Sequence, residues 1–482
     1  MSVRAVFEFS MDKKDLIEKS CPPRSAPYTV LERRSGLNLI LHQERPAWAV
    51  VNDVGLQVLK LCRGDLKVEE ITSTIASRFG EGQSAIMHDI AGYINRLKRS
   101  NLIMTGNGRT PNGEYVPSLK GVSLNITGKC NLHCRHCAVV DAPVSRKSLI
   151  YKEICRIIDE LKDIDGSGLA VTGGEPLFRK EWLRILRYAM GKTRISLLTN
   201  GTLLNEYRAK VIADMDIDVQ ISLDGSNPSV HDHIRGKGAF EKTMKGVRLL
   251  LENDMAGKML VNTCVTGFNI DDIPAIIDLV SGMGIPYIRF LPLKEIGNAR
   301  KNWKEISVVD EEQVRIYKKL FNIIFHTSHK IKINSGLKGF FLSFPEDDDP
   351  YWQCPLGSRL IINEYGDIYP CPALMNMRMN NQRFSLGNVR ETSLDEAISS
   401  QRLRDLKLTF LSRKNLIGKC VTCCWRHLCG SGCAGSVFLA KGDFLQTDDL
   451  CAIRQELYKE TIFELASNRV STDSLVTDIM PC

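Results

Sequence analysis

Residues 130–137 read Cys-Asn-Leu-His-Cys-Arg-His-Cys and place Cys130, Cys134 and Cys137 in one short segment. The segment follows an apolar run at 122–126, so we expect it to leave a strand as a loop. Thiolates hold iron–sulfur clusters, and a compact run of cysteines is the usual sequence sign of such a site. A cubane [4Fe–4S] cluster needs four ligands and this loop supplies three, which would leave one iron open to bind a substrate. From these residues alone, a zinc knuckle and a chance grouping of thiols stay open as alternatives.

The composition describes a globular protein of several domains. The chain has 482 residues, of which 43% are hydrophobic and 25% are charged, and two to four domains are expected at this length. No apolar run approaches the roughly 18–20 residues of a membrane span, and no signal peptide is evident, so we expect a cytoplasmic location. The net charge of +8 is spread along the chain. It favours a solvated surface over a nucleic-acid site.

Cysteine usage points to metal ligation. Sixteen cysteines without a secretion signal argue against a disulfide scaffold and for thiolate ligands in a reducing cytosol. The cysteines outside tight spacings are expected to be incidental: Cys21, Cys62, Cys155, Cys264, Cys424 and Cys482.

The N-terminal part predicts a small winged-helix-like α+β module after a lead-in at 1–27. Strands are expected at 29–34 and 37–43, joined by a Ser35-Gly36 turn, and at 47–51, with Trp48 as the core anchor. Three helices should follow, the first from about 53 to 62. The apolar stripes of the other two are Val68, Ile71, Ile75 and Phe79, before a stop at Gly80, and Ile86, Ile90, Ile94 and Leu97.

After a Gly/Pro/Asn-rich linker at 105–118, strands and helices alternate. The expected strands are 122–126, 169–172, 195–199, 219–223, 259–265 and 287–291. The expected helices lie near 152–162, 180–190, 204–213, 240–253, 273–281 and 310–325. Such β-then-α units predict a parallel sheet, in which polar groups at the carboxyl ends of the strands carry the chemistry.

The turns after the second and third expected strands carry the next signals. Residues 172–176 read Thr-Gly-Gly-Glu-Pro, with Gly173 and Gly174 allowing close backbone approach and Glu175 offering a carboxylate. Asn200 follows the third strand. With the three-cysteine loop, this pattern resembles the radical SAM superfamily. The resemblance implies a partial (βα)6 barrel at 119–330, a [4Fe–4S] cluster with an open iron and S-adenosylmethionine, whose methionyl ammonium meets the Gly-Gly-Glu turn.

The fourth strand ends in Ser222-Leu-Asp-Gly, followed by His231 and Arg235. This resembles a pattern of radical SAM enzymes that modify peptides and proteins, and it implies that Ser222 and Arg235 contact the ribose and carboxylate of S-adenosylmethionine. For Asp224 and His231 a capping or packing role is an equal alternative to ligand contact.

Two further contacts are implied with the adenine. Leu291 on the sixth strand would supply an apolar wall, with core packing as the alternative, and His136 would place its ring there. By the same resemblance, the cluster and S-adenosylmethionine would generate a 5′-deoxyadenosyl radical that abstracts hydrogen from a substrate.

A third cysteine-rich region spans 345–455, before a C-terminal helix and tail at 456–482. Its spacing resembles the SPASM extension, which holds two auxiliary iron–sulfur clusters; a zinc array is the alternative. The resemblance implies an outer cluster on Cys420, Cys423, Cys429 and Cys451, and an inner cluster on Cys354, Cys371 and Cys433. No cysteine closely precedes Cys354. We therefore expect an oxygen ligand from Asp347, Asp348 or Asp349, or an open iron that contacts substrate.

The N-terminal module resembles PqqD-like peptide-recognition domains. The matching residues are Trp48, Asn52, the Arg63-Gly64-Asp65 turn before Val68-Glu-Glu-Ile71, and Leu97 with Leu102-Ile103. A nucleic-acid-binding winged helix is the alternative, but the third helix lacks a clustered basic face. The resemblance implies a separable domain at 28–104 that binds the leader of a precursor peptide along a strand edge.

Together these features lead to a SPASM-containing radical SAM oxidoreductase that crosslinks or epimerises a ribosomally synthesised peptide, supplied with electrons by a flavodoxin or ferredoxin. The alternatives are a SPASM enzyme acting on a small molecule or tetrapyrrole, and a non-catalytic iron–sulfur electron-transfer protein. Formylglycine formation is not expected, because Pro372 follows Cys371 where those relatives carry a carboxylate.

Overall fold

The computed structural model describes most of the chain. The described residues are 22–44, 47–99, 102–104, 119–138, 146–164, 168–308, 310–326, 331–335, 354, 356–375, 384–448 and 450–466. Within these ranges no helix has the length and apolar character needed to cross a bilayer.

The N-terminal module, residues 24–104, is built on a three-stranded antiparallel sheet. Its strands are β2 (Tyr28–Arg34), β3 (Leu37–His42) and β4 (Trp48–Asn52), in the order β2-β3-β4. Ser35 and Gly36 have φ values of 50° and 79°, as the predicted tight hairpin turn requires. The lead-in boundary was placed too late, because β1 (Arg24–Ser25) pairs antiparallel with β5 (Ile103–Met104) and so belongs to the module.

Three helices cover one face of this sheet: α1 (Asp53–Leu61), α2 (Val68–Phe79) and α3 (Gln83–Arg99). The predicted stripe on α3 is confirmed, since Ile86, Ile90, Ile94 and Leu97 are all buried in the module's core. Trp48 does not anchor that core. It is half-buried on the opposite face of the sheet, where it packs against the C-terminal part of the chain.

The central sheet has ten strands in the order β12-β11-β10-β9-β8-β7-β6-β13-β14-β15. They are β6 (Gly121–Thr127), β7 (Gly168–Gly173), β8 (Arg194–Thr199), β9 (Asp218–Ser222), β10 (Met259–Val265), β11 (Tyr287–Pro292), β12 (Lys332–Ser335), β13 (Arg359–Ile362), β14 (Asp367–Tyr369) and β15 (Gly387–Asn388). The described strands β6 to β12 run parallel, one more than the predicted six.

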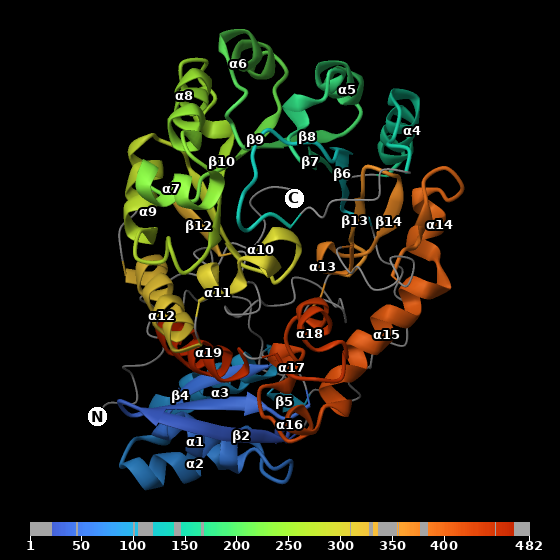
Figure 1. Ribbon diagram of the computed structural model, residues 1–482. Helices are drawn as coiled ribbons and strands as arrows, with labels where there is room; N and C mark the ends of the chain where they lie inside the picture. The colour runs from blue at the N-terminus through green and yellow to red at the C-terminus, as the bar shows by residue number, and fades with distance from the viewer. Residues whose placement is uncertain are drawn as a thin grey trace.

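The helices of this part lie mostly along the outer side of the arc that these strands form, whereas α10 and α11 lie inside it (Figure 1). The helices are α4 (Tyr151–Lys162), η2 (Pro176–Phe178), α5 (Trp182–Ala189), α6 (Glu206–Ala213), α7 (Pro228–Arg235), α8 (Ala239–Leu251), η3 (Ala256–Lys258), α9 (Ile273–Gly282), α10 (Gly297–Lys301), α11 (Trp303–Ile306) and α12 (Asp310–His326). Helix α4 illustrates how these helices pack. Its apolar residues share one helix face because of their spacing, and that face is buried on the sheet: Ile154, Ile157, Ile158 and Leu161.

The C-terminal part extends the same sheet and then turns back toward the N-terminal module. β13 is parallel to β6, whereas β14 and β15 add antiparallel pairs. The helices are α13 (Pro372–Met375), α14 (Leu394–Ser399), α15 (Gln401–Leu416), α16 (Gly418–Val421), α17 (Arg426–Cys429), α18 (Ala434–Lys441) and α19 (Cys451–Ala466). Figure 1 shows α17 and α19 between the barrel and the N-terminal module.

The carboxyl ends of parallel strands meet at one edge of a sheet. The three-cysteine loop follows β6, the Gly-Gly-Glu turn ends β7, Asn200 follows β8, Ser222 ends β9 and Leu291 lies near the end of β11. We call this edge, from β6 to β11, the catalytic edge.

Candidate active site and cluster sites

The three-cysteine loop, residues 130–137, forms a compact turn at the catalytic edge. The amide of Cys137 donates to the carbonyl of Cys134 at 3.2 Å, and the three thiols lie close enough to act on one another electrostatically. Burial raises the pKa of Cys134 to about 11, with Arg235 opposing it, and burial also raises the pKa of Cys130. These thiols therefore need a bound cation to lose their protons at neutral pH.

Gly173 and Gly174 let the end of β7 approach the start of this loop. The amide of Gly174 donates to the Thr127 carbonyl at 2.7 Å. A Cβ atom on Gly174 would lie 2.3 Å from the Lys129 carbonyl oxygen, and one on Gly173 would lie 2.2 Å from that of Thr127. The two glycines were expected to let the backbone approach a ligand. In the structure they let the end of β7 approach the loop that carries the cysteines.

The Glu175 carboxylate links the backbone at the end of β7 to the backbone at the end of β8. It is fully buried, and it accepts hydrogen bonds from the Leu177 amide at 3.1 Å, the Thr199 hydroxyl at 2.7 Å and the Asn200 amide at 2.8 Å. Burial raises its pKa while these donors oppose the rise. The expectation that this carboxylate faces an ammonium is therefore revised, since its side chain ties β7 to β8 and leaves only backbone groups of the turn exposed to a ligand.

Asn200 connects β8 to the start of the three-cysteine loop. Its Nδ2 donates to Asn131 Oδ1 at 3.1 Å and lies 3.8 Å from Cys130 Sγ, while its Oδ1 accepts from the Thr202 hydroxyl at 2.6 Å. An amide donor near a thiolate stabilises the negative charge on sulfur.

A buried charged cluster lies beside Cys134. Arg235 Nε is 2.6 Å from Asp224 Oδ2, and Arg235 Nη1 is 4.0 Å from Cys134 Sγ. His136 Nε2 is 3.4 Å from the same carboxylate. Burial disfavours the ionised form of Asp224, but the Arg235 guanidinium beside it brings its pKa below the usual value.

The histidines of this cluster are held in the neutral state. Burial lowers the pKa of both His136 and His231 to about 4. His231 Nδ1 accepts the Asp224 amide at 3.2 Å, which gives His231 the capping role that the sequence left open. His136 Nδ1 is buried without a hydrogen-bond partner among the described residues, so it is available to a bound group.

The end of the loop is held by α10 and α11, which the sequence did not single out. The Asn298 amide donates to the Cys137 carbonyl at 2.9 Å and its side chain to that of Cys134 at 3.2 Å. Asn302 Nδ2 donates to the Arg135 carbonyl at 3.1 Å. Gly297, with φ of 56°, leaves no room for a Cβ, which would lie 2.4 Å from the Cys137 oxygen. The run Gly297-Asn298 was a signal that could have been read.

Ser222 and Leu291 lie on the strands that flank β10. Ser222 is half-buried at the end of β9. Leu291 is 37% exposed near the end of β11, which excludes core packing as the reason for an apolar residue there. An exposed leucine at the catalytic edge is suited to cover an aromatic ring of a bound ligand.

Cys354, Cys371 and Cys433 are brought together from three separate segments. Their thiols act on one another electrostatically, and burial raises the pKa of Cys354 and Cys371. The Lys294 ammonium, just after β11, opposes the rise at Cys371, so this group of cysteines lies near the catalytic edge. Asp347, Asp348 and Asp349 fall outside the described residues.

Cys420, Cys423, Cys429 and Cys451 line one pocket. It encloses about 410 Å³ of empty space, part of it open to solvent, and Asp448, Arg454, Gln455 and Tyr458 also line it. Cys424 is not among the lining residues. The positions of Arg454, Gln455 and Tyr458 were not predicted, because no motif marks them.

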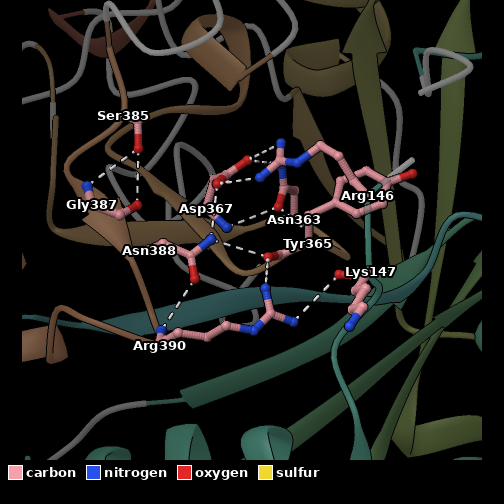
Figure 2. A network of polar contacts seen from close by, with 9 residues as sticks. All are labelled: Arg146, Lys147, Asn363, Tyr365, Asp367, Ser385, Gly387, Asn388 and Arg390. Atoms are coloured by element: carbon pink, nitrogen blue, oxygen red, sulfur yellow. Dashed lines mark hydrogen bonds and ion pairs between the residues drawn. The ribbon is translucent and has the colours of Figure 1, made fainter. Parts of the chain in front are cut away.

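A polar network fixes the β13–β14 turn beside the catalytic edge (Figure 2). Arg146 donates to both oxygens of Asp367 at 2.6 and 2.7 Å. Arg390 donates to the carbonyls of Tyr365 at 2.9 Å and Lys147 at 3.3 Å. The network ties the start of α4 to the C-terminal hairpin, so the barrel and the cysteine-rich region form one continuous structure.

The donor sets fit iron–sulfur clusters better than single ions. Within the described residues, no three Cys, His, Asp or Glu side chains converge closely enough to hold one metal ion, whereas each thiolate of a cubane binds a different iron and such thiols lie further apart. The described cysteines are free thiols. Three groups of free thiols, each containing members whose pKa is raised by burial, suit soft cluster irons.

Family comparisons match three parts of the chain. Residues 124–280 match the radical SAM superfamily, 354–424 match the SPASM iron–sulfur cluster-binding domain, and 38–103 match the coenzyme PQQ synthesis protein D, PqqD. The chain therefore carries a radical SAM domain, a SPASM domain and a PqqD domain. A radical SAM domain binds a [4Fe–4S] cluster and S-adenosylmethionine, and a SPASM domain binds auxiliary clusters.

Two of the curated relatives that this chain resembles differ in the function their names give. An AdoMet-dependent heme synthase of Methanosarcina barkeri is 28% identical over 69% of this chain and 96% of its own length. Mycofactocin maturase MftC of Mycolicibacterium smegmatis is 26% identical over 65% of this chain and 77% of its own. Both alignments cover most of the relative.

The fold of the radical SAM enzyme also matches a solved structure. SuiB of Streptococcus suis bound to S-adenosylmethionine aligns with a TM-score of 0.58 at 15% identity, covering 91% of this chain and 100% of SuiB. SuiB bound to its precursor peptide SuiA aligns with a TM-score of 0.57 at 15% identity, covering 89% and 99%. At this identity the likeness supports the shared architecture of barrel and added domains, as predicted.

Proposed function

We propose that this radical SAM enzyme modifies a ribosomally synthesised precursor peptide. The leader of the peptide would bind the N-terminal module while a residue further along reaches the catalytic edge. The observation that carries the proposal is the PqqD domain with unpaired sheet edges: within the described sheet, β2 and β4 each pair with β3 alone. An open strand edge takes an extended peptide through backbone hydrogen bonds.

The proposal extends to the residues that would hold the cofactors. Cys130, Cys134 and Cys137 would hold the [4Fe–4S] cluster with its open iron. Cys420, Cys423, Cys429 and Cys451 would hold the outer auxiliary cluster, with Cys354, Cys371 and Cys433 as ligands of the inner one. When bound, the first cluster and S-adenosylmethionine supply a 5′-deoxyadenosyl radical that abstracts hydrogen from a C–H bond.

The chain's own residues position these groups. Asn200, Asn298 and the backbone of Gly174 fix the shape of the three-cysteine loop. For S-adenosylmethionine we propose contacts with the backbone of the turn at 173–175, with Arg235 and Ser222, and with His136 and Leu291. Neutral His136 offers a free nitrogen and Leu291 an exposed apolar surface.

The product would be a carbon-centred crosslink, a thioether, an ether or an epimerised residue. A flavodoxin or ferredoxin in a reducing cytoplasm would supply the electrons. The similarity to MftC and the solved SuiB–SuiA complex support a peptide substrate for this chain.

A second candidate is a tetrapyrrole-modifying enzyme. Its support is the 28% identity to the M. barkeri heme synthase over 96% of that protein. The PqqD domain favours the peptide proposal, because a tetrapyrrole needs no leader-binding strand.

Co-expression separates the two candidates. The chain is co-expressed with each short open reading frame that neighbours its gene, and the peptides are analysed by tandem mass spectrometry. We expect one peptide to lose two hydrogen atoms, or to gain deuterium at one α-carbon in deuterated water. The Cys134→Ala chain is the control and should leave the peptide unchanged. Unmodified peptides together with turnover of a porphyrin substrate would overturn the proposal in favour of the second candidate.

A further inference from the structure

The first turns of α19 contribute to the outer cluster site. Cys451 begins the helix and lines the pocket. Arg454 Nη1 lies 3.6 Å from Cys429 Sγ, and Gln455 Nε2 lies 3.7 Å from the sulfurs of both Cys423 and Cys451. Arg454 is itself fixed by Asp448, at 2.6 and 3.1 Å. Donors of this kind around thiolates hold ligands in place and stabilise their charge.

The later turns of the same helix bind the N-terminal module through charged side chains. Arg34 on β2 donates to both oxygens of Glu460 at 2.7 and 3.0 Å, and its guanidinium lies 4.7 Å from the ring centre of Phe463. Lys459 Nζ lies 3.3 Å from Glu32 on the same strand. A bidentate Arg–carboxylate pair fixes orientation as well as distance.

An apolar interface lies beside these ion pairs. Leu39 and Leu41 on β3 are 0% and 1% exposed and point away from the module's own core, which holds Ile40 instead. They pack on a surface that we call the docking surface: Trp425, Leu428, Tyr458, Ile462 and Phe463. Half-buried Cys423, Cys424 and Cys429 pack against the same cluster of residues, so the module lies directly over the outer cluster site.

Two of the three helices around the pocket are too short to be stable by themselves, and one of them, α17, carries Leu428 of the docking surface. α16 (Gly418–Val421) and α17 (Arg426–Cys429) have four residues each, and isolated helices of this length do not form. Cysteines from α16, α17 and α19 meet in one pocket, so a bound cluster would cross-link all three elements. Metal binding supplies folding free energy in such small sites.

We propose that the outer cluster site docks the N-terminal module: ligation by Cys420, Cys423, Cys429 and Cys451 orders the docking surface on which Leu39 and Leu41 pack. On this proposal the module is held against the C-terminal part of the chain, while its separability as a domain stays a prediction. This role is independent of the substrate, and it would apply equally if the second candidate function were correct.

Hydrogen–deuterium exchange of the full chain tests the docking role. In Cys451→Ser, we expect amides at 28–42 and 454–463 to exchange about tenfold faster than in the wild type. Barrel strand β7, at 168–173, should be unchanged. Cys155→Ser is the control, because Cys155 is a half-buried cysteine on α4 that neither lines the pocket nor packs on the docking surface; it should exchange like the wild type. Unchanged exchange at 28–42 in Cys451→Ser, or equal acceleration in both variants, would overturn the proposal.

Wholesale loss of structure in Cys451→Ser would show as faster exchange at 168–173 as well. The wild-type chain is then compared before and after anaerobic reconstitution with iron and sulfide. Protection at 28–42 should rise with cluster loading, and no rise would overturn the proposal.

A charge exchange tests the interface independently of the cluster. Arg34→Glu should accelerate exchange at 28–42 and 454–463 while leaving the iron content unchanged, and adding Glu460→Arg should restore protection in part. If Arg34→Glu has no effect on exchange, the interface does not dock the module.

Discussion

The guanidinium of Arg235 lies between two partners, with its Nε 2.6 Å from the Asp224 carboxylate and its Nη1 4.0 Å from the sulfur of Cys134. Asp224 is completely buried and also accepts the Cys264 amide at 2.8 Å. The ion pair with Asp224 therefore holds the side chain of Arg235 in place. Arg235 is the residue that was expected to contact the carboxylate of S-adenosylmethionine.

Asp224→Asn should leave the Arg235 charge buried without its counter-charge. Breaking a buried pair costs about 3–5 kcal/mol, so we expect lower stability together with about tenfold weaker binding of S-adenosylmethionine. Thermal unfolding and equilibrium binding measure the two effects. Asp278→Asn, at an exposed position on α9, is the control and should change neither. Wild-type affinity in Asp224→Asn would show that Arg235 does not take part in binding.

Gly174→Ala should distort the three-cysteine loop, because the new Cβ would lie 2.3 Å from the Lys129 carbonyl oxygen. We expect loss of S-adenosylmethionine cleavage by at least about tenfold, with iron in the auxiliary sites retained. Gly257→Ala is the matched control, since a Cβ there meets nothing within 4 Å. Normal cleavage by Gly174→Ala would mean that the loop tolerates displacement by β7.

Cys134→Ala should abolish reductive cleavage of S-adenosylmethionine and keep most of the auxiliary iron. The reason is that the other two groups of cysteines lie on separate elements and do not depend on this thiol. Iron analysis and detection of 5′-deoxyadenosine measure the two results. Cleavage that persists in the variant would contradict the cluster assignment.

His231 should make stability depend on pH. Its pKa is lowered to about 4 by burial, so the unfolded chain takes up the proton first as pH falls. Its contribution is present above pH 6.5 and is lost between about 6.5 and 4, up to about 3 kcal/mol. In His231→Gln this loss should be smaller, as measured by thermal unfolding at several pH values. Parallel pH profiles for variant and wild type would exclude His231 as the titrating group.

Much of the fold was readable because its strands are short apolar runs between helical stripes. The predicted strand at 122–126 is β6 (Gly121–Thr127), and the predicted helix at 152–162 is α4 (Tyr151–Lys162). β12 (Lys332–Ser335) was missed because its sequence, Lys-Ile-Asn-Ser, has no apolar run. The pairing of β13 with β6 could not be predicted, since sequence periodicity does not specify which strands become neighbours.

The sequence predicts site residues where the chemistry requires a particular residue type, such as cysteine for an iron–sulfur cluster. It does not predict residues whose role depends only on where the fold places them. The resemblance to the SPASM extension grouped the thiols that line the outer pocket, but nothing in the sequence marks Arg454 as their neighbour or Asn302 as a partner of the three-cysteine loop. The direction of Glu175 was misjudged because a carboxylate next to two glycines can face either a ligand or the backbone. The contact between β3 and the C-terminal part of the chain could have been predicted. The run Leu39-Ile40-Leu41 places apolar side chains on both faces of the strand, which indicates that both faces are buried.

The parallel pairing of β13 with β6 also sets where this chain can be cut. Because Arg359–Ile362 covers β6 along Gly121 to Leu124, a truncated chain that ended after β12 would leave β6 as an open edge in the middle of its own active site. Such an edge recruits other strands and aggregates. Chimeras that exchange the cysteine-rich region between related enzymes should therefore carry β13 to β15 with the barrel and place the junction after Asn388.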